Sequence, residues 1–212
     1  MRRTRMNRPR ALRRTLTELA VTVAAAVAVA LVIQAVLVKP YKIPSGSMIP
    51  TLELGQRILV NRLDTKPTLG EVVVFHPPAG VPASNSGGYG RCGEADGGYS
   101  TSRPCDAPWG GESSKTYVKR VVGLPGDRLR VMDGYVYRNG IKESGSYVQP
   151  CGSTSGICSF TQQITVPRGS YYMMGDNRGE SDDSRFWGPV RQSWIIGVAF
   201  ATYWPLNRIG LL

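Results

Sequence analysis

The sequence contains a single histidine, His76, and this scarcity argues against a histidine-rich metal site. No two of its four cysteines have the Cys-x-x-Cys spacing that is typical of zinc sites. No internal repeat is apparent, and the chain has one apolar run of membrane-spanning length. A second apolar run, Trp194 to Trp204, is too short to cross a bilayer as a helix. The sequence therefore predicts no metal, no cofactor and a single membrane span.

The strong positive charge is confined to one end of the chain. The formal net charge is +11, but seven arginines lie within residues 1–14, so the rest of the chain carries only 11 − 7 = +4. A basic tail beside an apolar run is a signal for membrane topology. We therefore expect a lipid bilayer, and no nucleic acid, among the partners.

The apolar run from Leu19 to Val38 contains only two polar residues in twenty. At about 1.5 Å per residue, a helix of this length spans roughly 30 Å, the thickness of the hydrocarbon core. A cleavable signal peptide has a shorter apolar region, of roughly 7–15 residues. We therefore predict a retained transmembrane helix over residues 16–38.

The charge distribution predicts the orientation of this anchor. The positive-inside rule places an Arg-rich tail, residues 1–15, in the cytoplasm and residues 39–212 outside the cell membrane. Ser47 follows the anchor by only nine residues, which span at most about 30 Å when fully extended. Any chemistry at this serine is therefore expected close to the outer membrane face.

Residues 39–212 are predicted to form a mainly β domain. Glycine (25 residues) and proline (15 residues) are frequent, and Val-rich runs bounded by turn residues dominate after residue 55. Residues from about 79 to 115 are rich in Gly, Ser, Asn and Asp and read as an irregular surface insertion. The predicted strands are Gly55–Val60, Gly70–Phe75, Tyr117–Gly123, a hairpin from Arg128 to Tyr137 with an Asn-Gly turn after it, 163–166, 171–174 and Trp194–Trp204.

The four cysteines lie outside the membrane on this topology, where disulfides persist. Three pairings are possible, and we favour the local one, Cys92–Cys105 with Cys151–Cys158, because it would close two irregular segments. Four free thiols are the alternative.

The stretch from Pro44 to Leu52, PSGSMIPTL, follows the anchor directly. Two prolines restrict the backbone on either side of a flexible glycine, so a hydroxyl can be held in a fixed, exposed position. We interpret Ser47 as a nucleophile, with Ser45 and the backbone N–H of Ser47 as donors to an oxyanion. The alternative is an ordinary Ser/Gly/Pro loop.

A serine nucleophile needs a base. His76 is the generic choice, but it lies beside two prolines at the mouth of the insertion. Lys119 lies instead in an apolar strand, on one face with Tyr117 and Val121. Burial there would lower the pKa of its ammonium toward the range that a base requires. The alternative is a surface lysine on an edge strand.

A third stretch, GDNRGESDDSRFWG from Gly175 to Gly188, is polar and charged. In a strand-like register, Asp183 and Arg185 project on one face and can pair. A solvated charged turn is the alternative, and the acidic spacing does not fit a calcium-binding EF-hand.

Together the stretches PSGSMIPTL, TYVKRVVGLPGD and GDNRGESDDSRFWGPV, in this order behind an anchor, resemble the bacterial type I signal peptidases. These are membrane-bound serine endopeptidases that remove signal peptides from exported preproteins. The resemblance implies an antiparallel β-sheet catalytic domain preceded by one N-terminal transmembrane helix. It also implies cleavage after a small-x-small (Ala-x-Ala) site, with the enzyme close to the secretion machinery. A non-enzymatic, disulfide-bearing surface protein with one anchor is the alternative.

Carried over by position, the resemblance implies a Ser47–Lys119 dyad without a metal. Ser45 matches the side-chain donor of the oxyanion hole, and Ser181 matches the residue that holds the lysine nitrogen. Asp183 and Arg185 match a pair that stiffens the site. Asp176 belongs to the same supporting motif. The residues that match the apolar wall around the substrate's small side chains are Ile43, Pro44, Met48, Leu52, Tyr117 and Val118.

Overall fold

The computed structural model describes residues 8–79, 104–107, 110–152 and 158–212. The chain divides into two compact units, residues 1–39 and 40–212. Most of the predicted insertion, including Cys92, lies outside the described residues. The proposed Cys92–Cys105 disulfide therefore stays a prediction.

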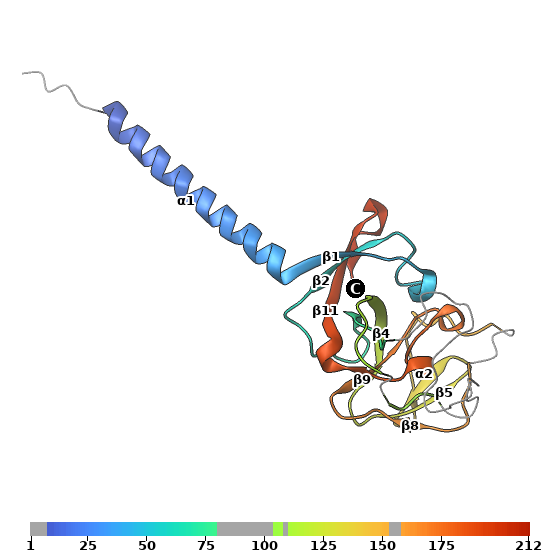
Figure 1. The fold of residues 1–212 in the computed structure, drawn as a ribbon. Helices are drawn as coiled ribbons and strands as arrows, with labels where there is room; N and C mark the ends of the chain where they lie inside the picture. Colours follow the sequence, from blue (N-terminus) through green and yellow to red (C-terminus); the bar gives the residue numbers. More distant parts are fainter. Residues whose placement is uncertain (1–7, 80–103, 108–109, 153–157) are drawn as a thin grey trace, which may run out of the picture. The chain divides into compact units, whose positions relative to one another are not determined.

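The first unit is formed by a single helix, α1, Arg8–Leu37 (Figure 1). Within it, Thr15–Val32 is long and apolar enough to cross a membrane, and none of that window is buried inside the protein. Its Leu and Val side chains are therefore exposed, as expected for a helix whose solvent is lipid. The helix begins earlier than the predicted span, because it includes arginines of the basic tail.

The second unit contains two antiparallel β-sheets, which confirms the predicted fold class. The larger sheet has the order β1-β2-β11-β3-β4-β9-β10, with β12 also paired to β11, and the smaller has the order β7-β6-β5-β8. In Figure 1, β5 and β8 of the smaller sheet are drawn below β4 of the larger sheet, within the second unit. The strands of the larger sheet are β1 Val38–Lys42, β2 Arg57–Asn61, β3 Val72–Phe75, β4 Tyr117–Gly123, β9 Ser170–Met174, β10 Val190–Arg191, β11 Ile195–Trp204 and β12 Gly210–Leu211.

The closing strand predicted near the carboxyl end is β11, and it links two parts of the larger sheet. Its first residues pair with β3 and its later residues pair with β2. A ten-residue strand is long enough to do both, and a register shift between Ala199 and Ala201 accommodates the pairing with β2. As a result β3 and β4 lie inside the sheet, not at its edge.

The smaller sheet is built from β5 Arg128–Met132, β6 Tyr135–Arg138, β7 Ile141–Lys142 and β8 Ile164–Thr165. Two tight turns connect the first three strands. Asp133-Gly134 and Asn139-Gly140 both have positive φ angles, the conformation that two-residue hairpin turns require. The predicted Asn-Gly turn is thus present, but it joins β6 to β7. The turn within the predicted hairpin is Asp133-Gly134.

Strands β3 and β9 are buried on both faces. In β9, Tyr171 and Met173 belong to one apolar cluster, whereas Tyr172 and Met174 belong to a second cluster shared with the smaller sheet. Burial on both faces explains the continuous apolar runs in these strands. The short elements are η1 Gly46–Met48, η2 Arg178–Glu180, α2 Ser184–Trp187, η3 Gln192–Trp194 and η4 Leu206–Arg208.

Cys151 and Cys158 form a disulfide, as predicted. It closes the loop that leads from the smaller sheet toward Phe160, a residue buried in the second cluster.

Candidate active site

Ser47 and Lys119 meet although they are 72 positions apart in the sequence. Nζ of Lys119 lies 2.6 Å from Oγ of Ser47, at hydrogen-bond distance. Both residues are buried, with exposed fractions of 7% for Ser47 and 4% for Lys119. Their approach follows from two local structures, the turn η1 that carries Ser47 and the internal strand β4 that carries Lys119.

The position of Lys119 is set by the sheet. It is paired with Val73 of β3, and β4 is flanked on its other side by β9. Lys119 is therefore not a surface lysine on an edge strand, which was the alternative. Burial lowers the pKa of its ammonium to about 8, although Asp183 and Asp182 act in the opposite direction.

Ser45 lies next to the pair, because its hydroxyl donates to Oγ of Ser47 at 3.3 Å. The backbone carbonyl of Ser47 accepts from the backbone N–H of Asn177 at 3.1 Å. This bond ties the serine turn to the polar segment that begins at Gly175. That close approach requires the glycine: a Cβ at position 175 would lie 2.2 Å from Oγ of Ser181 and 2.4 Å from the Ser47 carbonyl oxygen.

Asp176 is fully buried and holds two other parts of the site together. It forms a bidentate ion pair with Arg120, with Nε–Oδ1 and Nη2–Oδ2 distances of 2.8 and 2.7 Å. Thr51, which follows the serine turn, donates to the same carboxylate at 2.5 Å. Arg120 points away from Lys119 by strand alternation. No pattern in the sequence indicated a role for Arg120.

Asp183 and Arg185 form a second buried ion pair, with Nε–Oδ1 and Nη2–Oδ2 distances of 2.8 and 2.9 Å. The Asp183 carboxylate also accepts from the backbone N–H of Gly175 at 3.1 Å. Burial alone would raise the pKa of Asp183, but the Arg185 guanidinium outweighs this effect and holds the pKa below its usual value. The predicted pairing is therefore present, but the strand-like register was wrong. Asp183 is extended and caps α2, and Arg185 lies within that helix.

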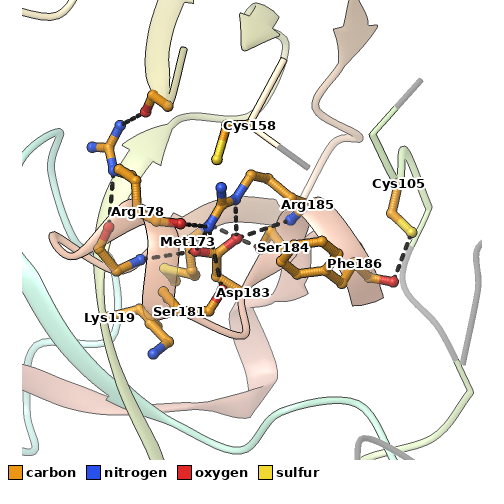
Figure 2. Close-up of polar contacts among 12 residues, drawn as sticks. Cys105, Lys119, Cys158, Met173, Arg178, Ser181, Asp183, Ser184, Arg185 and Phe186 are labelled. Carbon is orange, nitrogen blue, oxygen red and sulfur yellow. Dashed lines mark hydrogen bonds and ion pairs between the residues drawn. The ribbon is translucent and has the colours of Figure 1, made fainter. Parts of the chain in front are cut away.

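Arg178 extends this network into the smaller sheet, as Figure 2 shows in part. Its Nε donates to the carbonyl of Gly175 at 2.9 Å, and its own carbonyl accepts from Arg185 at 2.7 Å. Its Nη2 donates to Glu143 at 2.9 Å, and Nη1 contacts both Glu143 and the carbonyl of Gly134. This link was absent from the sequence analysis, since no local pattern connects residues so far apart in the chain.

Ser181 is buried near the pair but does not hold the lysine nitrogen in this structure. Within the described part of the chain its hydroxyl forms no hydrogen bond with Lys119. Figure 2 shows Ser181 and Lys119 on the same side of Asp183. His76 is bound elsewhere: its Nδ1 lies 2.8 Å from the carbonyl oxygen of Lys115, and its Nε2 lies 4.0 Å from Glu112.

A pocket of about 240 Å³ opens beside Ser47 and Lys119. Five of the six predicted wall residues line it, namely Ile43, Pro44, Met48, Tyr117 and Val118. The sixth, Leu52, is fully buried in the apolar cluster that also contains Ile43 and Met48. Two acidic residues that the sequence analysis did not single out, Glu180 and Asp182, also line the pocket. Among the described residues, no group of three or more His, Cys, Asp or Glu side chains could hold a metal ion.

Comparison with known proteins gives a consistent result. The family model described as "Signal peptidase, peptidase S26" matches residues 16–204. "Probable signal peptidase I-2" of Synechocystis sp. is 32% identical over 199 residues, which cover 92% of this chain and 76% of that protein. "Signal peptidase I" of Pseudomonas aeruginosa is 32% identical over 228 residues, covering 84% of this chain and 69% of the relative. A crystal structure of a signal peptidase I from Enterococcus faecalis is similar at 26% identity and a TM-score of 0.39, covering 63% of this chain and 96% of that one. The family match spans the apolar helix, the turn η1 that carries Ser47 and the strand β4 that carries Lys119, and the chain therefore belongs to the signal peptidase family, peptidase S26, as a membrane-anchored serine peptidase that cleaves signal peptides.

Proposed function

We propose that Ser47 and Lys119 act as a catalytic dyad. The observation that carries this proposal is the 2.6 Å separation of Oγ and Nζ inside a buried site. The Ser47 hydroxyl attacks the scissile carbonyl while the neutral Lys119 amine accepts its proton. Lys119 then delivers the proton to the leaving amine, and water hydrolyses the acyl-enzyme. Burial supplies the neutral amine because it disfavours the charged form.

Ser45 and the backbone N–H of Ser47 are proposed to stabilise the oxyanion that develops on the carbonyl. The supporting role falls to Asp176, Asp183 and Arg185. The two carboxylates anchor both ends of the polar segment, Asp176 through Arg120 and Asp183 through Arg185. Ser181 is proposed to contact the lysine nitrogen when substrate is bound.

The pocket supports cleavage after a small-x-small sequence such as Ala-x-Ala. Its apolar wall is contributed by Ile43, Met48 and Val118, and its volume of about 240 Å³ is small for a peptide-binding site. We propose that the preprotein lies extended against this wall and places small side chains into it, in the manner of strand addition.

The anchor is proposed to hold the enzyme in the cell membrane with its amino terminus in the cytoplasm. The seven arginines within residues 1–14, on the amino-terminal side of the apolar segment, favour this orientation. Residues 40–212 then lie outside, next to the bilayer and close to the secretion machinery that delivers preproteins. Nucleic acid is not expected among the partners.

The pH dependence of kcat/KM tests the identity of the base. A protonated Lys119 cannot accept a proton, so activity should be low at acidic pH and rise through the lysine pKa of about 8. The measurement is the rate of cleavage of a purified preprotein in detergent between pH 5 and pH 10, with wild type and with His76→Ala. Both should show the same rising limb. A limb near the ordinary imidazole pKa of about 6.5 that disappears in His76→Ala would make His76 the base.

Adding one methyl group at Gly175 should impair catalysis more than folding. In Gly175→Ala the new Cβ must displace the Ser47 carbonyl or Ser181, and a shift of about 1 Å at a reacting group can cost about 10²-fold in kcat. Gly197→Ala is the matched control. Its Cβ would lie 2.2 Å from the carbonyl oxygen of Asn61, and neither Gly197 nor Asn61 lines the pocket. Comparison of kcat and urea stability for both variants checks this, and an unchanged kcat for Gly175→Ala would contradict the proposed arrangement.

A further inference from the structure

The pocket contains two carboxylates that neither the dyad nor the supporting ion pairs use. Glu180 and Asp182 flank Ser181, and both line the pocket with Ser47 and Lys119. Glu180 is exposed and Asp182 is half-buried, so both can be reached from solvent. The neighbour that Glu180 contacts on its own segment is a neutral amide, since Nδ2 of Asn177 lies 3.3 Å from its carboxylate.

The negative charge of Asp182 acts at the reacting centre. Asp182 opposes the lowering of the Lys119 pKa by burial. It also adds to the effect of burial in raising the pKa of Tyr117, another residue of the pocket. Among the described residues that line the pocket, Lys119 is the only one with a basic side chain. When Lys119 is neutral, as the dyad requires, this described lining carries two negative charges and no positive charge.

We propose that Glu180 and Asp182 make this peptidase select for charge close to the scissile bond. Preproteins with a basic side chain between the two small residues, or within two residues after the bond, are favoured, and those with an acidic side chain there are disfavoured. The proposal rests on the Ser47–Lys119 dyad as the place where the bond is cut, because only then do the two carboxylates face the substrate.

The expected size follows from the exposure of the two carboxylates. Solvent-exposed ion pairs contribute modestly, so exchanging Glu for Lys at the most sensitive substrate position should raise kcat/KM about fivefold at low ionic strength. Screening should reduce this ratio at about 0.5 M salt, because the Debye length falls below the distance across the pocket.

The test uses the full-length protein in detergent and a series of peptides that contain one Ala-x-Ala site. Lys, Gln or Glu is placed in turn at each of three positions, namely the residue between the two alanines and the two residues after the bond. The measured quantity is the ratio of kcat/KM for the Lys and Glu peptides, for wild type and for Glu180→Gln, Asp182→Asn and the double variant. Within one variant this ratio is independent of any change in the pKa of Lys119. Asp133→Asn, which removes one charge in the β5–β6 turn outside the pocket, is the matched control.

The expected result is a Lys/Glu ratio of about five at one position at least, which Asp133→Asn retains and the double variant reduces toward one. A ratio near one at every position in wild type overturns the proposal, as does a ratio that survives in the double variant. Cleavage of the Gln peptides separates this outcome from a failure of the dyad. If wild type cleaves them and neither Ser47→Ala nor Lys119→Ala does, the dyad stands whether or not the charge selection does.

Discussion

Replacement of Ser47 or Lys119 by alanine is expected to reduce preprotein cleavage by at least about 10³-fold, the largest effect of any single change in this chain. Each variant removes one member of the proposed dyad. Among the described residues, Nζ of Lys119 is the only basic group at hydrogen-bond distance from Oγ of Ser47. Groups that act as a unit are strongly non-additive, so the double variant should be no slower than either single variant. Single-turnover cleavage in detergent measures all three.

Two other substitutions control for this result. Lys142→Ala removes a lysine that lies over the Tyr135 ring in the smaller sheet, outside the site, and should retain full activity. His76→Ala should also retain it, since His76 contacts Lys115 and Glu112. Substantial turnover by a folded Lys119→Ala variant would remove the lysine from the mechanism.

Substitution of Arg185 by alanine should lower the free energy of unfolding by about 3–5 kcal/mol, because it leaves Asp183 buried without its cationic partner. Both side chains are at most 2% exposed, so water cannot replace the lost bonds. The same change removes hydrogen bonds to the carbonyls of Arg178 and Ser181. Urea unfolding of the purified protein gives the value.

Arg138→Ala is the matched control for this loss. Arg138 pairs with Asp127 at 3.2 Å, but its side chain is 36% exposed. Removal of such a partly exposed pair should cost less than about 1 kcal/mol. Equal losses for the two arginine variants would show that the fully buried pair contributes no more than a pair with a partly exposed arginine does.

Much of the fold was readable from local sequence. The strands β2, β3, β4 and β11 follow Val-rich or mixed apolar runs between glycine and proline, and the alternation along β4 separates Lys119 from Arg120 correctly. The serine segment and the lysine strand were recognised because each is a contiguous motif, but the expected exposure of the Ser47 hydroxyl was wrong, since Ser47 is buried. The alternation of side chains along a strand and the residue preferences of a turn depend on neighbouring residues, so both can be read from a single sequence.

The supporting contacts could not be predicted because they join distant residues. Nothing in the sequence links Arg120 to Asp176, 56 positions away, or Glu143 to Arg178, 35 positions away. The strand register assumed for Asp183 and Arg185 failed for another reason. In a strand, residues i and i+2 project on the same face and can pair. They can also pair at the start of a short helix when residue i is the N-cap, as Asp183 is for α2. The pairing alone therefore does not distinguish the two conformations.

The link from Glu143 through Arg178 to the dyad has a consequence for the newly made enzyme. Gly175, where an added Cβ would lie against the Ser47 carbonyl, accepts a hydrogen bond from Arg178. The counter-ion of this arginine is Glu143, which directly follows β7 of the smaller sheet. Ser47, Lys119 and the polar segment that supports them come from early, middle and late parts of the chain. The proposed dyad is therefore complete only when all three parts are packed together, so a chain shortened before residue 175 should lack activity.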